Sequence, residues 1–204
     1  MAKPTRALPS SSSESSWSCN RMEPWQRLEP TTVQKVGWRT VVTKRFRLPG
    51  GQAADFQTIG GEQSHCIATI ALTPDRQVVV SRQFRVGPEK VLDELPGGGA
   101  NAGEDFELAA RRELEEETGY APGRMEFLGD VYKDAYTNTT WHFFLATDCR
   151  PVPTGQHLDE HEHVAVRRIT IEQLFRNARS GCMTDAVAVF LALDRLKAMQ
   201  KEEM

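Results

Sequence analysis

The sequence has few cysteines and no long apolar run. Its 204 residues contain four cysteines, Cys19, Cys66, Cys149 and Cys182, which are far apart and form no CxxC pair. Because such cysteines, with no evident secretory signal before them, are typical of reducing compartments, we expect free thiols and a cytoplasmic protein. No segment approaches the ~18 consecutive apolar residues that a membrane-spanning helix needs, so we expect no membrane association.

The sequence also lacks an excess of positive charge. Lysine and arginine number 25 against 28 aspartates and glutamates, which gives a formal net charge of −3. A protein that binds nucleic acid along an extended surface needs the opposite balance, so we expect no nucleic-acid partner. Hydrophobic residues make up 39% and charged residues 26% of the chain, which is sufficient for a globular domain with its own core.

Composition divides the chain into three parts. Residues 1–21 hold seven serines and two prolines, with little to bury, and we expect a disordered tail. Residues 22–62 contain two runs typical of strands, Thr40–Leu48 and Ala54–Ile59, separated by a turn. They predict a small antiparallel β lobe, which needs the main domain or a second subunit to pack against because so few strands are marginal alone.

The main domain, residues 63–204, alternates strand and helix patterns. We expect strands followed or preceded by helices in a mixed order, which indicates the α/β class and an α/β/α sandwich with a mixed sheet. The expected strands are Cys66–Leu72, Gln77–Phe84, Met125–Tyr132, Trp141–Thr147 and Val164–Ile169. The expected helices are Asp105–Thr118, Ile171–Ser180 and Thr184–Met199, and glycines end the first two.

The helix expected at Asp105–Thr118 concentrates acidic residues on one face. Glu113, Glu116 and Glu117 are spaced by three and four residues, so their carboxylates lie close together and repel one another. A cation would relieve this repulsion, and hard oxygen ligands of this kind suit Mg²⁺ or Mn²⁺ together with substrate phosphates. The alternative interpretation is an acidic face that contacts only water, which is the usual fate of a charge run.

The spacing around these glutamates argues against coincidence. With residue frequencies of roughly one in fifteen, seven fixed identities coincide by chance about once in 10⁸ windows. The segment resembles the Nudix box, which reads G, five residues, E, seven residues and REUxEExGU, where U is a bulky apolar residue. The matching residues are Gly98, Glu104, Arg112, Glu113, Glu116, Glu117 and Gly119, with Leu114 and Tyr120 at the two U positions.

The resemblance implies a Nudix hydrolase, which cleaves a nucleoside diphosphate linked to another moiety. By position in the motif, Glu113, Glu116 and Glu117 would be the metal ligands, and the Gly97 carbonyl would be a further ligand. Glu116 would thereby also be part of the catalytic machinery, and Arg112 would orient a ligand carboxylate through a charge-assisted hydrogen bond. Magnesium is the expected cofactor, with manganese as the alternative.

The segment just before the box is similar to that of the ADP-ribose and nucleoside-diphosphate-sugar pyrophosphatases. Members of this branch often carry an RQ(F/Y)R…E(L)PGG stretch, and the chain reads RQFR at 82–85 and ELPGG at 94–98. The match implies substrate contacts from Arg82, Arg85 and Glu94, and support of the base by Phe84. Simple surface solubility for the arginines and core packing for the phenylalanine are the competing interpretations.

The polar loop HLDEHEHVAV, residues 157–166, supplies candidates for a general base. The same branch often provides a catalytic glutamate from this loop, so that Glu160 or Glu162 would activate the attacking water, with a slight preference for Glu160. The loop also holds His157, His161 and His163, for which a zinc site is the alternative to exposure to water.

Taken together, the residues and the resemblance predict metal-dependent hydrolysis of ADP-ribose or a related nucleoside diphosphate sugar. The products would be a nucleoside monophosphate and a sugar phosphate. The alternatives are a housecleaning hydrolase of nucleoside triphosphates and a non-catalytic nucleotide sensor. Related pyrophosphatases pair through an N-terminal lobe, so the resemblance also implies a homodimer formed through residues 22–62.

Overall fold

The computed structural model describes residues 23–160 and 162–201, so the expected disordered tail and Cys19 lie outside the described residues. Within those residues, no helix is long and apolar enough to cross a membrane. The three cysteines in this part of the chain, Cys66, Cys149 and Cys182, are free.

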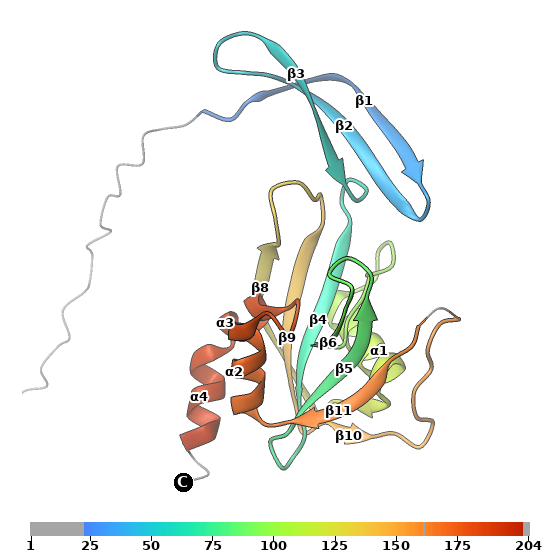
Figure 1. Ribbon diagram of the computed structural model, residues 1–204, viewed down its shortest axis with the longest axis vertical. Coiled ribbons are helices and arrows are strands. Elements are labelled where there is room, and N and C mark those ends of the chain that lie inside the picture. Colours follow the sequence, from blue (N-terminus) through green and yellow to red (C-terminus); the bar gives the residue numbers. More distant parts are fainter. Residues whose placement is uncertain (1–22, 161, 202–204) are drawn as a thin grey trace, which may run out of the picture.

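A three-stranded antiparallel sheet forms the N-terminal part. Strands β1 (Gln26–Val36), β2 (Arg39–Arg47) and β3 (Ala53–Ile59) follow one another in space as in sequence. The sheet stands at one end of the molecule, beyond the tip of the main domain (Figure 1). Its small apolar cluster consists of Trp25, Phe46 and Phe56, whose ring centroids lie 5.5 to 6.4 Å apart.

The main domain is built on a mixed sheet, as expected. Its strand order is β11-β5-β4-β9-β8, with β6 paired to β5. The β4–β9 pair is parallel and the others are antiparallel. The strands are β4 (His65–Leu72), β5 (Val78–Arg85), β6 (Lys90–Glu94), β8 (Arg124–Tyr132), β9 (Thr140–Thr147) and β11 (Ala165–Ile169), while β7 (Tyr120–Ala121) and β10 (Arg150–Pro151) form a separate small sheet.

Helices cover both faces of this sheet, which confirms the α/β/α sandwich. Helix α1 (Phe106–Thr118) lies on one face, and α2 (Ile171–Ser180), α3 (Ala186–Leu191) and α4 (Leu193–Lys201) gather on the other (Figure 1). Side chains of β4 alternate between the two faces, so this strand contacts both layers of helices. The side chains in the core under α2–α4 are Ala68, Ile70 and Leu72, and those on the side of α1 are Ile67 and Ala71.

The ends of α1 follow from its sequence. The Asp105 carboxylate accepts hydrogen bonds from the backbone N–H groups of Glu107 and Leu108 at 3.0 and 3.1 Å. Gly119 ends the helix in the left-handed conformation at φ 68°, and a Cβ there would lie 2.9 Å from the carbonyl carbon of Gly155. A larger residue at this end would therefore displace the loop that follows β10.

Two expectations about the elements were wrong. The single helix expected over Thr184–Met199 is two helices, because Ala192 leaves the helical conformation at φ −90° and ψ 2°. Strand β6 was not expected at all. Its five residues carry little β pattern of their own, and it forms because it pairs with the second half of β5.

The sheet opens between β4 and β5, and this opening positions the glycine-rich segment. The two strands pair over only two residue pairs, beginning at Ala71 and Val79. Beyond that point the segment after β6 takes the place of β5 beside β4, with Thr69 N–H bonded to Pro96 O at 3.0 Å and Ile67 N–H to Gly98 O at 2.9 Å. Gly97 is thereby held against β4, where a Cβ would lie 2.2 Å from the carbonyl oxygen of Ile67.

Thr69 provides a stability prediction, because its hydroxyl is fully buried and has no hydrogen-bond partner within the described residues. We expect Thr69→Val to leave the free energy of unfolding unchanged or to raise it by about 1 kcal/mol, since an unsatisfied buried hydroxyl is removed at constant shape. Thr118→Val is the matched control, because its buried hydroxyl donates to Leu114 O and accepts from Tyr120 N–H, and its loss should cost about 1–3 kcal/mol. Urea unfolding measures both, and equal destabilisation of the two variants would contradict the prediction.

Candidate active site

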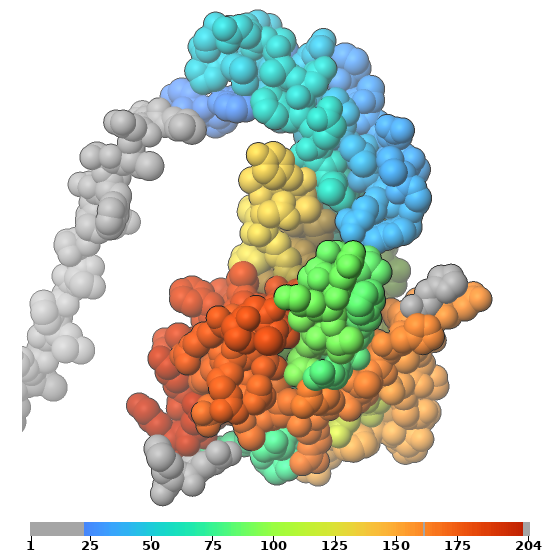
Figure 2. Space-filling view, viewed as in Figure 1, coloured from blue at the N-terminus to red at the C-terminus, as the bar shows by residue number. Residues whose placement is uncertain are grey.

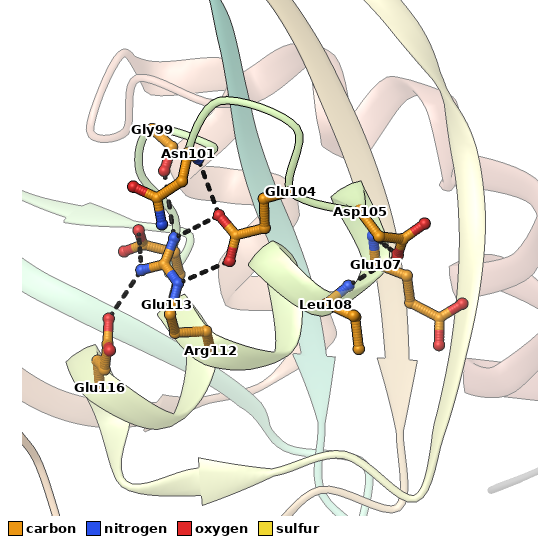
Figure 3. Close-up of polar contacts among 9 residues, drawn as sticks. All are labelled: Gly99, Asn101, Glu104, Asp105, Glu107, Leu108, Arg112, Glu113 and Glu116. Carbon is orange, nitrogen blue, oxygen red and sulfur yellow. Dashed lines mark hydrogen bonds and ion pairs between the residues drawn. The ribbon is translucent and has the colours of Figure 1, made fainter.

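The Arg112 guanidinium organises the acidic face of α1 (Figure 3). Its Nε and Nη2 donate to the two carboxylate oxygens of Glu104 at 3.0 and 3.2 Å. Its Nη1 donates to Glu113 Oε1 at 2.7 Å and to Glu116 Oε2 at 2.9 Å, and Nη2 also reaches Gly99 O at 3.3 Å. One planar cation therefore holds two of the three predicted metal ligands and the glycine-rich loop in a single arrangement.

Glu104 fixes the orientation of this guanidinium. The hydrogen bonds from Arg112 lower the pKa of Glu104 to about 2, and the bond to Glu104 in turn raises the pKa of Arg112. The Glu104 carboxylate also accepts a hydrogen bond from Asn101 N–H at 2.8 Å. Both partners thus keep their charges throughout the neutral pH range, so that the guanidinium remains a fixed part of the site.

Glu117 lies deepest of the three helix glutamates, at 5% exposure. Its Oε2 accepts hydrogen bonds from Ser81 Oγ at 2.9 Å and from Gly97 N–H at 3.2 Å. Burial raises the pKa of Glu117 to about 8, and the charges of Glu113 and Glu162 add to this effect while the two hydrogen bonds oppose it. Within the described residues both donors reach the same oxygen, which leaves Oε1 for another ligand.

Glu113 and Glu116 lie nearer the surface on the same helical face. The Glu113 side chain is 14% exposed, and burial raises its pKa, with Glu116 and Glu162 contributing through their charges. A Cβ on Gly98 would lie 2.7 Å from Glu113 Oε2, so the absence of a side chain there makes room for this carboxylate. The Glu116 side chain is 43% exposed and faces outward.

The donor set fits a hard divalent cation. Burial raises the pKa of both Glu113 and Glu117, so a cation beside them would stabilise the charged forms of these all-oxygen donors. Residues 23–160 and 162–201 contain no group of three His, Cys, Asp or Glu side chains already gathered around one point. Arg112 Nη1 donates to both Glu113 and Glu116, and Ser81 Oγ donates to Glu117, so each of the three carboxylates has a hydrogen-bond donor from the protein.

The backbone of Gly97 also faces this cluster. The carbonyls of Pro96 and Gly98, on either side, point to β4. The N–H of Gly97 points the other way, to Glu117. Because the N–H and C=O of one residue point to the same side of an extended segment, we infer that the Gly97 carbonyl faces Glu117 as well.

The structure separates the four residues that sequence reasoning assigned to the substrate. Arg85 Nε donates to Glu94 Oε2 at 2.6 Å, and the Glu94 side chain is 1% exposed. Arg82 instead pairs with Asp93 at 3.2 Å on the opposite face of β5, and Phe84 lies on that face too, 56% exposed. Arg85 and Glu94 thus lie together on one face of the sheet, and Arg82 and Phe84 lie on the other.

The reason for this difference in placement is the two-residue period of a strand. In β5 every second side chain points to the same face, so Ser81, Gln83 and Arg85 share one face and the residues between them share the other. A contact with β6 supports this assignment of faces, because Gln83 Nε2 donates to Glu94 Oε2, the oxygen that also binds Arg85, at 3.3 Å. The alternation was visible in the sequence and would also have pointed to Ser81, which sequence reasoning missed.

The loop that carries the two candidate bases is attached to the end of α1. His157 N–H donates to Glu116 O at 2.8 Å. Glu162 is turned back onto its own loop, where its Oε2 accepts from Asp159 N–H at 3.1 Å, and its charge acts on both Glu113 and Glu117. Glu160 is exposed, and His161 lies outside the described residues.

A cleft with two chambers adjoins the carboxylates at Gly97. One cavity of about 390 Å³ is lined by Gly97, Arg85 and Glu94, and a second of about 440 Å³ lies beside it. Figure 2 shows the β1–β2 turn, in blue, reaching down beside the β5–β6 turn, in green. The residues common to both cavities are Trp38, Arg39, Lys133 and Trp141.

The first two of these shared residues come from the N-terminal sheet, and sequence reasoning did not assign them or Lys133 to the site. Trp38 is 82% exposed, and the Arg39 guanidinium lies 4.4 Å from the centroid of its ring. Nothing in the local pattern after Gly37 indicates a cleft, since only the fold brings this turn to the main domain. The N-terminal sheet therefore contributes directly to the cleft wall.

Comparison with known proteins agrees with this geometry. The NUDIX domain profile matches residues 64–187, more than half of the chain, and the protein therefore belongs to the Nudix family. An ADP-ribose pyrophosphatase of Bacillus subtilis is 30% identical over 144 residues, which is 70% of this chain and 77% of that protein. A methanol dehydrogenase activator of Bacillus methanolicus is 29% identical over 143 residues, covering 70% and 76% of the two chains.

A solved structure shares the fold. The crystal structure of an ADP compounds hydrolase superposes with a TM-score of 0.67 at 21% identity, covering 84% of this chain and 97% of that one. The expected fold, the Nudix membership in the ADP-ribose pyrophosphatase branch and the pyrophosphohydrolase class are confirmed. The chain is accordingly an enzyme that hydrolyses nucleoside diphosphate-linked compounds, and Nudix hydrolases generally use divalent metal ions.

The raised pKa of Glu117 predicts how stability changes with pH in protein treated with a chelator. The folded state holds this proton up to about pH 8, whereas the ordinary pKa is 4.5, so the contribution of this group to stability is lost as pH rises between these values. Glu117→Gln removes the titration and should raise the melting temperature by a few degrees at pH 8.5, with a smaller difference at pH 5. Thermal unfolding at both values tests this.

The control is Glu115→Gln, which removes one negative charge from the same helix at a half-buried position. If the two variants shift the melting temperature equally at both pH values, the burial of Glu117 is not the cause.

Proposed function

We propose that the protein hydrolyses the pyrophosphate bond of ADP-ribose or a related nucleoside diphosphate sugar. The products are a nucleoside monophosphate and a sugar phosphate. The similarity to the Bacillus subtilis protein named as an ADP-ribose pyrophosphatase supports this substrate class. The observation that carries the proposal is the cavity of about 390 Å³ at Gly97, because it places the cation Arg85 beside the acidic helix, where a diphosphate can reach both Arg85 and a metal held by the carboxylates.

The metal would be held by Glu113, Glu116 and Glu117, with the carbonyl of Gly97 as a further ligand. Their oxygen donors suit Mg²⁺, and Mn²⁺ is the alternative. When bound, the cation supplies Lewis-acid stabilisation of the phosphate oxygens and lowers the pKa of a bound water. The protein's own part is to keep these carboxylates in place, which Arg112 does through Glu113 and Glu116 and which Ser81 does through Glu117.

Arg85 would bind a phosphate of the substrate. Burial works to lower its pKa, but the hydrogen bond and charge of Glu94 outweigh this and raise it, so the guanidinium stays charged in the cleft. Glu94 therefore acts as the group that orients Arg85 rather than as a direct phosphate contact, because two negative groups repel. A guanidinium fixed in this way offers its remaining donors to a phosphate with the correct geometry.

Glu162 would take the proton from the attacking water. Its loop ends close to the acidic helix, and its charge acts on Glu113 and Glu117. A general base must come within about 3 Å of the water, so Glu162 would exchange the hydrogen bond that it accepts from Asp159 N–H for one from that water. Glu160, which is exposed, is the second candidate in the same loop.

A panel of substrates with Mg²⁺ tests the proposed function. We expect wild-type protein to release nucleoside monophosphate from ADP-ribose and other nucleoside diphosphate sugars, and to lose this activity with a chelator. Glu162→Gln should reduce kcat by about 10²–10⁴-fold, because general-base catalysis contributes that much, whereas Glu160→Gln is the matched control and should stay within a few-fold of wild type. Turnover of nucleoside triphosphates alone would overturn the proposal.

We also propose a cytoplasmic homodimer that forms through the N-terminal sheet. The three described cysteines are free, in keeping with a reducing compartment. The sheet formed by β1–β3 exposes large apolar side chains, with Val33 at 65% and Val36 at 55% exposure. A second copy covering this sheet would remove that apolar surface from water.

Light scattering checks the oligomeric state. At micromolar concentration we expect a mass of twice the 22.9 kDa of one chain, because the small N-terminal sheet buries few apolar residues of its own. Val33→Asp with Val36→Asp should shift the protein towards the monomer. A monomeric wild type, or a dimer unaffected by the two aspartates, would contradict a dimer formed through this face.

A further inference from the structure

Lys133 is a cation held at a fixed point in the wall of the cleft. It follows the last residue of β8, and its Nζ lies 2.7 Å from Asp185 Oδ1 and 3.4 Å from the ring centroid of Trp141 on β9. The side chain is 22% exposed, so the ammonium group is partly shielded from water and still accessible from the cleft. A lysine in these surroundings has lost most of its usual freedom.

The groups that hold Lys133 are themselves fixed. Asp185 is 4% exposed, and its Oδ2 accepts hydrogen bonds from Leu95 N–H at 3.4 Å and from Thr184 Oγ1 at 3.3 Å. Thr184 Oγ1 also lies 2.9 Å from Glu94 Oε1, the other oxygen of which is bound to Arg85. The ammonium group and the guanidinium are therefore connected through one polar network along the floor of the cleft.

The position of Lys133 matters because it lines both chambers. The cavity of about 390 Å³ contains Gly97 and Arg85, whereas the cavity of about 440 Å³ contains Ser64, Thr137 and other polar residues. A ligand that occupies both chambers must cross between them beside this ammonium group.

The chemistry of the ammonium group points to an anion at the crossing. A lysine has three N–H donors, and Asp185 accepts one of them. The ammonium group also lies over the π face of the Trp141 ring, which attracts its positive charge. The side chain is 22% exposed and lines both cavities, so its remaining donors are available to a ligand in the cleft. A phosphate oxygen that arrives there gains a charge-assisted hydrogen bond from a group that is already oriented.

We propose that Lys133 is a specificity residue that contacts the diphosphate of the substrate on the side away from Arg85. The protein thereby prefers ligands with two linked phosphates over ligands with one. This inference rests on the proposed function, since it concerns the same cleft. A lysine that only connected the end of β8 to the segment before α3 would contribute stability but would not distinguish these ligands.

Calorimetric titration of the full chain with ADP and with AMP tests the inference, with Ca²⁺ replacing Mg²⁺ in all samples. Lys133→Met should weaken ADP binding by tenfold or more, because a hydrogen bond to a charged group is lost, and should change AMP binding by less than twofold. In steady-state assays the same variant should raise KM for nucleoside diphosphate sugars more than it lowers kcat. Lys197→Met, an exposed lysine on α4, is the matched control and should match wild type.

Two further results distinguish a specificity role of Lys133 from a structural one. Lys133→Arg keeps the charge and should retain part of the preference for ADP; equal impairment of the arginine and methionine variants would overturn the inference. Equal weakening of ADP and AMP, with a lowered melting temperature, would assign Lys133 a structural role and would also overturn it. The proposed function is judged separately, by the turnover of wild-type protein on the substrate panel.

Discussion

The repulsion among carboxylates crowded onto one turn of α1 is the constraint on which the rest of the site depends. Glu113 and Glu117 are placed where burial raises their pKa, and each is steadied by a different part of the chain. Arg112 holds Glu113 and Glu116 from within the helix, and Glu104 aims Arg112 in turn. One guanidinium therefore stabilises several carboxylates but neutralises only part of their charge. A site for a divalent cation needs such a remaining negative charge.

The opening between β4 and β5 gives these carboxylates access to a ligand. The glycine-rich segment fills the gap beside β4, and Gly97 and Gly98 occupy positions where a side chain would collide with Ile67 or with Glu113. Backbone groups thereby come next to the acidic helix, and Gly97 connects the carboxylates to the cleft. The pairing of β5 with β6 brings Arg85 and Glu94 together on the strand face that also carries Ser81, the hydrogen-bond partner of Glu117.

The cleft is completed by elements that are remote in sequence. The β1–β2 turn contributes Trp38 and Arg39, the end of β8 contributes Lys133, and the segment before α3 contributes Asp185. The acidic helix thus carries the residues that resemble the Nudix box, whereas elements remote in the sequence line the cleft beside it. Sequence similarity to pyrophosphatases is therefore stronger evidence about the acidic helix than about the elements that line the cleft.

The sequence by itself determined the acidic helix, the glycine that ends it and the succession of the main strands along the chain, because these depend on local residue types and on spacings of three, four or two residues within a continuous segment. The resemblance to the pyrophosphatase branch pointed to Arg85 and Glu94 together with Arg82 and Phe84, and the alternation along β5 places the last two on the opposite face. Only the tertiary structure decided that Ser81 supports Glu117 and that Lys133 meets Asp185 in the cleft wall. These contacts join residues separated by tens of positions, and the packing of sheets and helices that creates them leaves no local signal in the chain.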